Sequence, residues 1–316
     1  MRSLGWLGIL LSCFVSGGAT CARREATLPY PPPPIVLYQT PTLDELAGLV
    51  NRTAAISQLS SNSATVTVLS MPSVPRLTNS TLHLQRERQF RLRASLPIIL
   101  GAGVDMGSND ELFWFEVPEG IGKKTLYYAR HDQYQQQLHR AILPVDPTWV
   151  MDALGLVQID PATVVEGPVL RQDGKLEVRS TLSMPDGVYQ KVCFIDAGGG
   201  YVTDQLMYSP SGNLIAQSTA TKHVYYEQVQ CPLPHQVELT LSPTVGEPLS
   251  MRIEVGNYAV NQLLSGDPNL FAMPQSASNA VDLTTLSAPV GPIVPSGPSN
   301  YSASVPGAYP LRGTVR

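Results

Sequence analysis

Alternation of apolar and polar residues runs through most of this chain, and it constrains the fold more than any other feature of the sequence. In residues 80–96 the apolar positions share one face of an extended chain: Leu82, Leu84, Phe90, Leu92 and Ala94. Arg91 and Arg93 fall on the other face, so we expect both basic side chains to face solvent. A period of two is typical of β-strands with one buried face, and it predicts a mainly β protein.

Turn sequences separate the alternating segments. Residues 185–187 (PDG) and 209–213 (SPSGN) are tight-turn sequences, so the strands that flank them are expected to pair antiparallel. Residues 101–107 contain Gly-x-Gly without the spacing of a nucleotide-binding motif, and we interpret them as a loop. The pattern predicts about eleven strands, the clearest at 64–70, 80–96, 111–117, 125–130, 175–184, 188–196, 201–209, 213–226, 235–242 and 249–260.

Two helices are predicted among the strands. The first covers residues 42–59, where Thr42 and Glu45 form a capping-box signature and apolar residues recur at helical spacing. The second covers residues 146–154, with Asp146 as its N-cap. The bulky apolar residues of this second helix share one side, which must face the sheet: Trp149, Val150, Ala153 and Leu154.

The N-terminus has the composition of a secretory signal. One basic residue precedes a run of about a dozen mostly apolar residues, which is too short for a membrane span of roughly 20, and small residues follow at 16–20. Cys21 comes next, as in bacterial lipoprotein signals, in which the cysteine is acylated and becomes the mature N-terminus. We predict a signal peptide over residues 1–20 and lipidation of Cys21. Gly18 and Thr20 depart from the usual box, and ordinary signal cleavage would leave Cys21 as an unmodified thiol.

The remaining cysteines follow from that assignment. Removal of Cys13 with the signal and lipidation of Cys21 would leave Cys193 and Cys231 in an oxidising compartment. These two are a disulfide candidate whose closed loop would contribute at most roughly 4 kcal/mol. The alternative is that Cys193 is a small buried apolar residue, and the sequence leaves both interpretations open.

Composition divides the chain into regions. Residues 21–41 are predicted to be a lipidated N-terminus followed by a proline-rich spacer that holds the next element away from a membrane. Residues 42–274 are predicted to form one β domain, and residues 275–316 a disordered tail rich in proline, serine and glycine. Charged residues make up only 15% of the chain and the net charge is −4, so nothing basic suggests a nucleic-acid partner.

No pattern of catalytic or metal-binding residues stands out in the sequence. The five histidines lack metal-site spacing, and no serine or cysteine motif offers a nucleophile. His131, in the RHDQ stretch at residues 130–133, is interpreted as part of a hydrogen-bonded surface cluster rather than of an acid–base pair. We therefore expect no enzyme activity, no catalytic residue, no cofactor and no metal.

The order of these elements resembles a known family. A helix, several strands, a short helix after a central hairpin and a second run of strands, all behind a lipoprotein signal, resemble the lipoprotein carrier and receptor family of the LolA and LolB type. Residues 92–156 (LRASLPIIL…DPTWVMDALGL) also resemble a set of uncharacterised bacterial envelope lipoproteins. The resemblance implies a strongly curved, open antiparallel sheet, an incomplete barrel, with two helices plugging its concave face. It carries over no functional residue, because ligand contacts in that family are scattered apolar side chains.

Two functions follow as expectations. The first is binding of a lipid or a lipoprotein acyl chain in an apolar cavity, with a role in lipoprotein sorting. The protein would be anchored to the cell envelope through its lipid and would face the periplasm. The second is a non-enzymatic scaffold lipoprotein with a fully packed core. Ala22 follows the cysteine in place of the aspartate that retains lipoproteins in the inner membrane, which favours the outer membrane. Aromatic and apolar residues that could line or cover a cavity, or could simply form core, are Phe113, Trp114, Phe115, Tyr127, Tyr128, Trp149 and Leu154.

Overall fold

A computed structural model describes seven parts of the chain, which are residues 31–95, 103–118, 124–136, 149–243, 247–262, 266–275 and 279–285. Its strands form one sheet in the order β15-β6-β5-β4-β3-β2-β1-β13-β12-β11-β10-β9-β8-β7, and β14 pairs with β1 off this path. Neighbours in this order are antiparallel except β15 and β6, which run parallel. The fold class predicted from the sequence is confirmed.

The chain builds this sheet as two runs of strands that meet in its middle. The first run comprises β1 (Gln58–Val68), β2 (Leu77–Gln85), β3 (Gln89–Ser95), β4 (Gly103–Ser108), β5 (Leu112–Pro118) and β6 (Lys124–Arg130). The second comprises β7 (Val164–Leu170), β8 (Lys175–Met184), β9 (Gly187–Asp196), β10 (Val202–Tyr208), β11 (Leu214–Tyr226), β12 (Cys231–Leu241) and β13 (Leu249–Val255). The two short strands are β14 (Ala259–Val260) and β15 (Asn279–Asp282).

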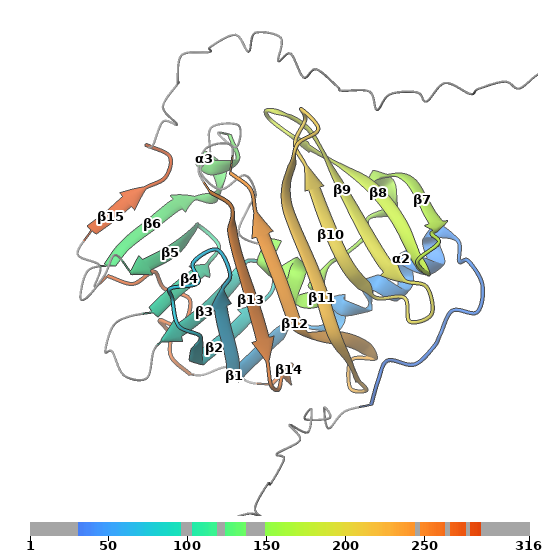
Figure 1. Cartoon of the computed structure of the whole chain (residues 1–316), viewed down its shortest axis with the longest axis horizontal. Coiled ribbons are helices and arrows are strands. Elements are labelled where there is room, and N and C mark those ends of the chain that lie inside the picture. The colour runs from blue at the N-terminus through green and yellow to red at the C-terminus, as the bar shows by residue number, and fades with distance from the viewer. Residues whose placement is uncertain are drawn as a thin grey trace, which may run out of the picture.

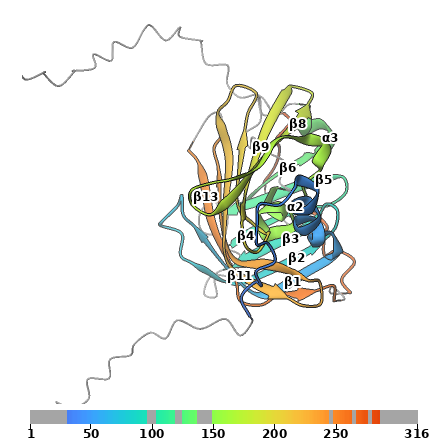
Figure 2. The ribbon, with the colours of Figure 1, turned by 90° about the vertical axis from the view of Figure 1, so that its right-hand side faces the viewer.

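Pairing of β1 with β13 joins the two runs. Val66 lies opposite Ile253, and both side chains are buried. The sheet curves strongly, and the helical segments lie on its concave side (Figures 1 and 2). These segments are α2 (Leu43–Val50), the 3-10 helix η1 (Asn51–Ala55), α4 (Trp149–Met151) and the π-helical turn η3 (Asp152–Leu156). Outside this group are α3 (His131–Gln135), after β6, and the 3-10 helix η4 (Pro161–Thr163), before β7.

The first helix begins where the sequence predicts. The Glu45 amide N–H donates to Thr42 Oγ1 at 3.3 Å, and the Thr42 amide N–H donates to Glu45 Oε2 at 2.8 Å, which completes the capping box. The α-helix ends at Val50, earlier than predicted, and a 3-10 turn follows before β1. Leu46, Ala47 and Val50 are buried against β8, β9 and β10.

Residues 80–96 were expected as one strand and instead form the hairpin of β2 and β3. Leu84 lies opposite Phe90, and Leu82 lies opposite Leu92. Each pair joins two even-numbered residues, and residues directly opposite each other share a face of the sheet. The alternation therefore continues through the turn without a break, which conceals the hairpin in the sequence.

The structure has more strands than the sequence predicted. Residues 103–108, which we interpreted as part of a loop, form β4 between β3 and β5. Gly107 allows this close approach, because a Cβ there would lie 2.3 Å from Cζ2 of Trp114. The predicted strand at 249–260 is divided into β13 and β14.

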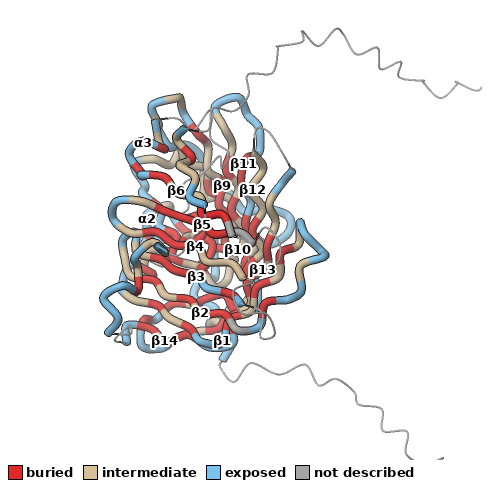
Figure 3. Tube along the Cα trace, turned by 90° about the vertical axis from the view of Figure 1, so that its left-hand side faces the viewer, coloured by how far each residue is buried: buried red, intermediate tan, exposed pale blue. Residues whose placement is uncertain are grey.

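Most of the apolar side chains gather in one core between the two halves of the sheet. This main core contains residues from β1, β2 and β3, residues from β9 to β13, and the segment 149–156. A second cluster lies between α2 and strands β8 to β10, and a small third cluster joins β5, β6 and α3. Buried positions alternate with more exposed ones along the strands (Figure 3). The concave side is thus filled by helical segments in the part of the chain that the structure describes.

Contacts with the sheet extend beyond residues 42–274 at both ends. The Tyr225 amide N–H donates to the Pro31 carbonyl at 3.1 Å, and the amides of Val36 and Leu37 donate to the Gly198 carbonyl at 2.8 and 2.9 Å. The second half of the predicted spacer therefore lies against β11 and the turn after β9. At the other end, β15 pairs with β6 inside the predicted disordered tail, and Leu283 is 4% exposed.

Deletion of residues 288–316 is expected to leave the Tm almost unchanged. This segment is rich in proline, serine and glycine, and it has too few apolar anchors to offset the entropy of ordering it. Deletion of residues 279–316 removes β15 and the buried Leu283 as well, so its Tm should fall clearly. Thermal unfolding followed by circular dichroism compares the two truncations. An equally low Tm for both would show that residues 288–316 pack on the domain.

Candidate functional site

The centre of the concave face is covered by the segment 149–156. We call this segment the cover; it consists of α4 and η3. Its apolar side chains are almost fully buried in the main core, with Trp149 5% exposed and Leu154 0% exposed. Gly155 has a φ of 93° and lies so close to β12 that a Cβ would stand 2.6 Å from Cδ of Pro234. Glycine is therefore required where the cover ends against the sheet.

An ion pair ties the cover to the sheet. Lys191 Nζ on β9 lies 2.7 Å from Oδ2 of Asp152, and the two side chains are 15% and 34% exposed. Gln205 on β10 donates from Nε2 to the backbone carbonyl of Asp152 at 3.1 Å. The Lys191 ammonium also lies 5.6 Å from the centre of the Trp149 ring, within the range of a cation–π interaction. Two neighbouring strands thus direct a donor toward a single residue of the cover.

The register of the sheet explains why these donors meet. Cys193 lies opposite Gln205, and Lys191 lies opposite Met207. Residues two apart on a strand point to the same face, so Lys191 and Gln205 share the concave face in adjacent strands. Their neighbours on that face are apolar, since Cys193 and Met207 are 3% and 7% exposed. This is a small polar centre in an apolar wall.

Among the described residues, two buried polar atoms at this centre have no hydrogen-bond partner. They are Nε1 of Trp149, which can only donate, and Oε1 of Gln205, which can only accept. A buried polar group without a partner costs about 1–3 kcal/mol. A ligand with an acceptor would satisfy the indole N–H, and one with a donor would satisfy the amide oxygen.

The local environment keeps Lys191 charged and Cys193 neutral. Burial alone would lower the pKa of Lys191, but the Asp152 carboxylate and its hydrogen bond raise that pKa above its ordinary value. Burial raises the pKa of the Cys193 thiol, although the nearby ammonium opposes this effect. The centre therefore presents a permanent cation and an unreactive thiol.

A narrow cleft lies beside the end of the cover. Its volume is about 20 Å³, enough for one water molecule, and it is lined by residues of α2, η1, β10 and β11 together with Gly155, Val157, Cys231 and Pro232. An acyl chain needs a cavity of several hundred Å³. A ligand could enter this region only if the cover moved.

The aromatic residues predicted to line a cavity do not come together with Trp149. Phe115 and Tyr127 pair across β5 and β6 and stack at 5.0 Å, while Phe113 belongs to the small third cluster. Trp114 and Tyr128 pair one position along, so they face the opposite side of the sheet. The period of two separates neighbours in sequence onto two faces, so these residues do not form one shared aromatic cluster.

The structure contains no bond between Cys193 and Cys231, one of the two interpretations that the sequence left open. Cys193 and Cys231 are both free thiols, and both are buried. Cys193 belongs to the cluster under α2, whereas Cys231 belongs to the main core. In the structure Cys193 is a small buried residue in an apolar cluster, in agreement with the other interpretation. Cys21 lies outside the described residues, and its lipidation stays a prediction.

His131 lies at the start of α3 rather than on the surface. It is 2% exposed, and its Nε2 lies 3.1 Å from Oγ of Ser108 and 3.0 Å from the carbonyl oxygen of Asn109. Among the described residues no group of three or more His, Cys, Asp or Glu is placed to hold a metal ion. A search of the same residues finds no helix with the length and apolar character of a membrane span.

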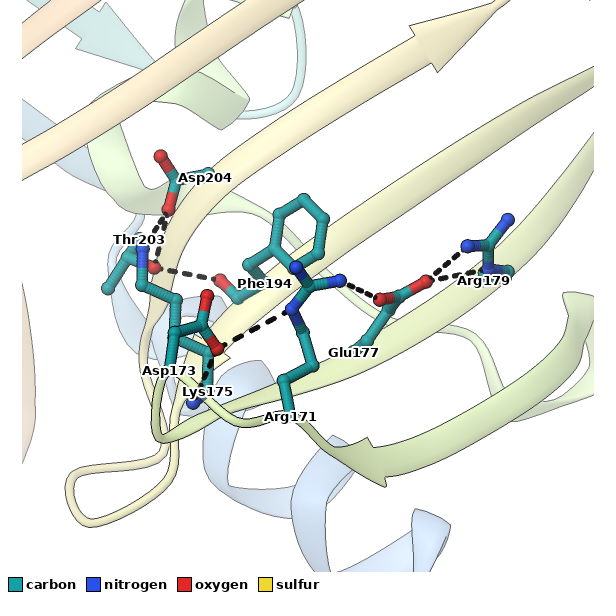
Figure 4. A network of polar contacts seen from close by, with 8 residues as sticks. All are labelled: Arg171, Asp173, Lys175, Glu177, Arg179, Phe194, Thr203 and Asp204. Carbon is teal, nitrogen blue, oxygen red and sulfur yellow. Dashed lines mark hydrogen bonds and ion pairs between the residues drawn. The ribbon is translucent and has the colours of Figure 1, made fainter. Parts of the chain in front are cut away.

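A polar network covers the opposite face of β8, β9 and β10 (Figure 4). Glu177 accepts hydrogen bonds from Arg171 and Arg179, and Lys175 Nζ lies 2.6 Å from Oδ2 of Asp204. The Arg171 guanidinium stands 4.8 Å from the centre of the Phe194 ring. Arg171, Lys175, Phe194 and Asp204 are among the residues that border a groove of about 210 Å³. The cationic and anionic side chains shown in Figure 4 pair with one another, so the groove has no excess of either charge.

Acid is expected to destabilise the protein through His223. Burial lowers the pKa of His223 to about 4 from its ordinary 6.5. Between these values only the unfolded chain binds the proton, so the stability that neutral His223 contributes is complete above pH 6.5 and is lost as the pH falls through 4, by about 3 kcal/mol. His223→Gln should flatten that part of the pH profile of urea unfolding. An unchanged profile would show that other groups, such as His235, carry the dependence.

Comparisons with known proteins return structural neighbours only. No family model matches the chain, and no curated protein matches it. Its solved neighbours include a domain from Vibrio parahaemolyticus described as an outer membrane lipoprotein-sorting protein, at 11% identity and TM-score 0.45, covering 72% of this chain and 94% of that one. A LolA superfamily protein from Nitrosomonas europaea matches at 9% identity and TM-score 0.37, covering 72% and 97% of the two chains.

A third neighbour is a DUF1329 family protein from Desulfovibrio piger, at 8% identity and TM-score 0.39, covering 70% of this chain and 92% of that one. One of the three names is that of a lipoprotein-sorting protein, and another is that of the LolA superfamily, the family type that the sequence resembles. Because every TM-score is below 0.5, we base no inference about function on these likenesses.

Proposed function

We propose that this protein is an envelope lipoprotein that binds an acyl chain, of a lipid or of another lipoprotein, against the concave face of its sheet beneath the cover. One observation carries the proposal: the cover and the concave face of the sheet meet through buried apolar side chains of the main core. An apolar wall of this kind suits a hydrocarbon chain. The role is binding rather than catalysis.

The cover is suited to move. Its α-helical part is only Trp149–Met151, and a π-helical turn completes it. Within the described residues, three side-chain hydrogen bonds hold the cover to its surroundings. Two run from Lys191 and Gln205 to Asp152, and one runs from Arg86 to the Leu156 carbonyl at 3.3 Å. Segments with few hydrogen bonds open at a lower free energy than the core of a sheet. The arrangement in the structure is the closed one.

A packed interior favours a second candidate function. Trp149 and Leu154 are buried in the main core, and the neighbouring cleft holds no more than a water molecule. A scaffold lipoprotein whose sheet is permanently filled would have this interior. The two candidates differ in one measurable property, which is whether the cover responds to an amphiphile.

Tryptophan fluorescence distinguishes them. Trp114→Phe leaves Trp149 as the reporter within the described residues, and Trp149→Phe is the matched control in which Trp114 reports instead. We expect the emission of Trp149 to shift on titration with laurate or with a diacylated lipopeptide, and the control to stay constant. If neither amphiphile shifts the emission of Trp114→Phe, acyl binding beneath the cover is contradicted and the scaffold function remains.

Anchoring has its own prediction. If Cys21 is acylated, each buried methylene contributes about 0.8 kcal/mol, and several chains hold the protein on a membrane. Cys21→Ser is then expected to move the protein into the soluble envelope fraction, whereas Cys13→Ser, in the segment predicted to be removed, should leave it on the membrane. Fractionation on a density gradient measures both, and we propose the outer membrane as the site. Persistent membrane association of Cys21→Ser would exclude a lipid anchor at this residue.

A further inference from the structure

We infer that Lys191 and Gln205 form a carboxylate-binding site on the concave face, that Asp152 of the cover fills this site in the structure, and that the ligand is an amphiphile with a free carboxylate, such as a fatty acid. The inference rests on the proposed function, because it names the ligand class for the same acyl-binding face.

The first argument is the convergence of donors. Lys191 Nζ lies 2.7 Å from the Asp152 carboxylate, and Gln205 Nε2 lies 3.1 Å from the carbonyl of the same residue. Both donors come from the sheet, and both acceptors come from the cover. Movement of the cover would leave an ammonium and an amide N–H side by side with no acceptor. One carboxylate, with two oxygens, could take both.

The second argument is that the closed arrangement leaves hydrogen bonding incomplete. Trp149 Nε1, a donor, has no partner among the described residues although the side chain is only 5% exposed, and a ligand carboxylate could accept its hydrogen bond. Asp152 is 34% exposed, so its carboxylate can be approached from solvent. A ligand carboxylate could therefore replace the Asp152 carboxylate at a site that solvent reaches and where a buried donor lacks an acceptor.

The third argument concerns the surroundings of the cation. On the same strand Lys191 is flanked by Tyr189 and Cys193, which are 5% and 3% exposed, and Val178 lies opposite Cys193 at 2% exposure. A charge in an apolar wall matches a ligand with one charged head and a hydrocarbon chain. A carboxylate would form an ion pair with the ammonium, whereas a neutral ester head would make only a hydrogen bond to it. A free carboxylate should therefore bind more tightly than an ester or amide of the same chain.

Affinities for matched amphiphiles test the inference. Laurate, methyl laurate and dodecyltrimethylammonium carry comparable chains with a negative, a neutral and a positive head. Calorimetry on the full chain should show laurate binding about tenfold or more tightly than methyl laurate, and the cationic amphiphile most weakly. Asp152→Asn removes the competing carboxylate and keeps the backbone carbonyl, so it should tighten laurate binding further.

The double variant Asp152→Asn with Lys191→Met removes both charges, and so avoids leaving either one unpaired in the wall. It should bind laurate and methyl laurate equally. Equal affinities of laurate and methyl laurate in both the wild type and Asp152→Asn would overturn the carboxylate site and leave acyl binding intact. Failure of Asp152→Asn to bind any of the three amphiphiles would overturn the proposed function itself. If the double variant does not fold, the comparison in Asp152→Asn decides alone.

Discussion

Replacement of Arg91 with leucine is expected to lower the free energy of unfolding by about 3 to 5 kcal/mol. Arg91 is 2% exposed and lies 2.8 Å from Oδ2 of Asp105. Its Nη1 donates to three backbone carbonyls, those of Asn269, Leu270 and Ala272, at 3.2, 2.9 and 3.1 Å. Leucine would leave these acceptors and a largely buried carboxylate without their main donor.

Arg93 provides the matched control. It lies two positions along the same strand and contacts the same carboxylate, with Nε 3.2 Å from Oδ2 of Asp105, but its side chain is 52% exposed. Exposed ion pairs contribute about 0–1 kcal/mol, so Arg93→Leu should change stability little. Urea denaturation of both variants measures the difference. Equal losses would show that burial by residues 269–272 does not strengthen the Arg91 contacts.

Trp149→Ala is expected to have a similarly large cost, about 3 to 5 kcal/mol, because it removes a buried indole from the main core. Trp149→Phe keeps a ring in that position and should cost less. Chemical denaturation of both variants gives the two values. A loss below about 1 kcal/mol for Trp149→Ala would mean that the cover adds little to the closed core.

The contrast between Arg91 and Arg93 shows where sequence patterns lose information. Alternation correctly placed both side chains on the face away from the main core, and it therefore predicted that both meet solvent. Residues 269–272 follow roughly 180 positions later, and they cover Arg91 but not Arg93. A period of two identifies the face of a strand. It cannot identify what a distant segment places over that face.

Local signals were the most informative. The capping box of Thr42 and Glu45 fixed the start of α2, and the tight-turn residues at 185–187 and 209–213 correctly marked β8–β9 and β10–β11 as antiparallel neighbours. β15 was missed because it is only four residues long and pairs in parallel with β6, without a turn that would announce its partner.

The candidate site was only half predictable. The apolar side of the second helix pointed to Trp149 and Leu154, and the structure buries both. Nothing in the sequence connects Asp152 with Lys191, which are 39 positions apart, or with Gln205. These contacts depend on where the cover lies over β9 and β10. Turn sequences and strand alternation constrain the pairing of the two strands but not the position of the cover on them.

Native mass spectrometry of the full-length protein, purified from its own membrane in mild detergent, tests acyl binding beneath the cover most directly. We expect a polypeptide that begins at an acylated Cys21 and carries one additional non-covalent amphiphile. We expect Asp152→Asn with Lys191→Met to carry amphiphiles without preference for those that bear a carboxylate. A protein that carries no non-covalent amphiphile, and that retains none after incubation with laurate, methyl laurate or a lipopeptide, would contradict acyl binding and leave a packed scaffold.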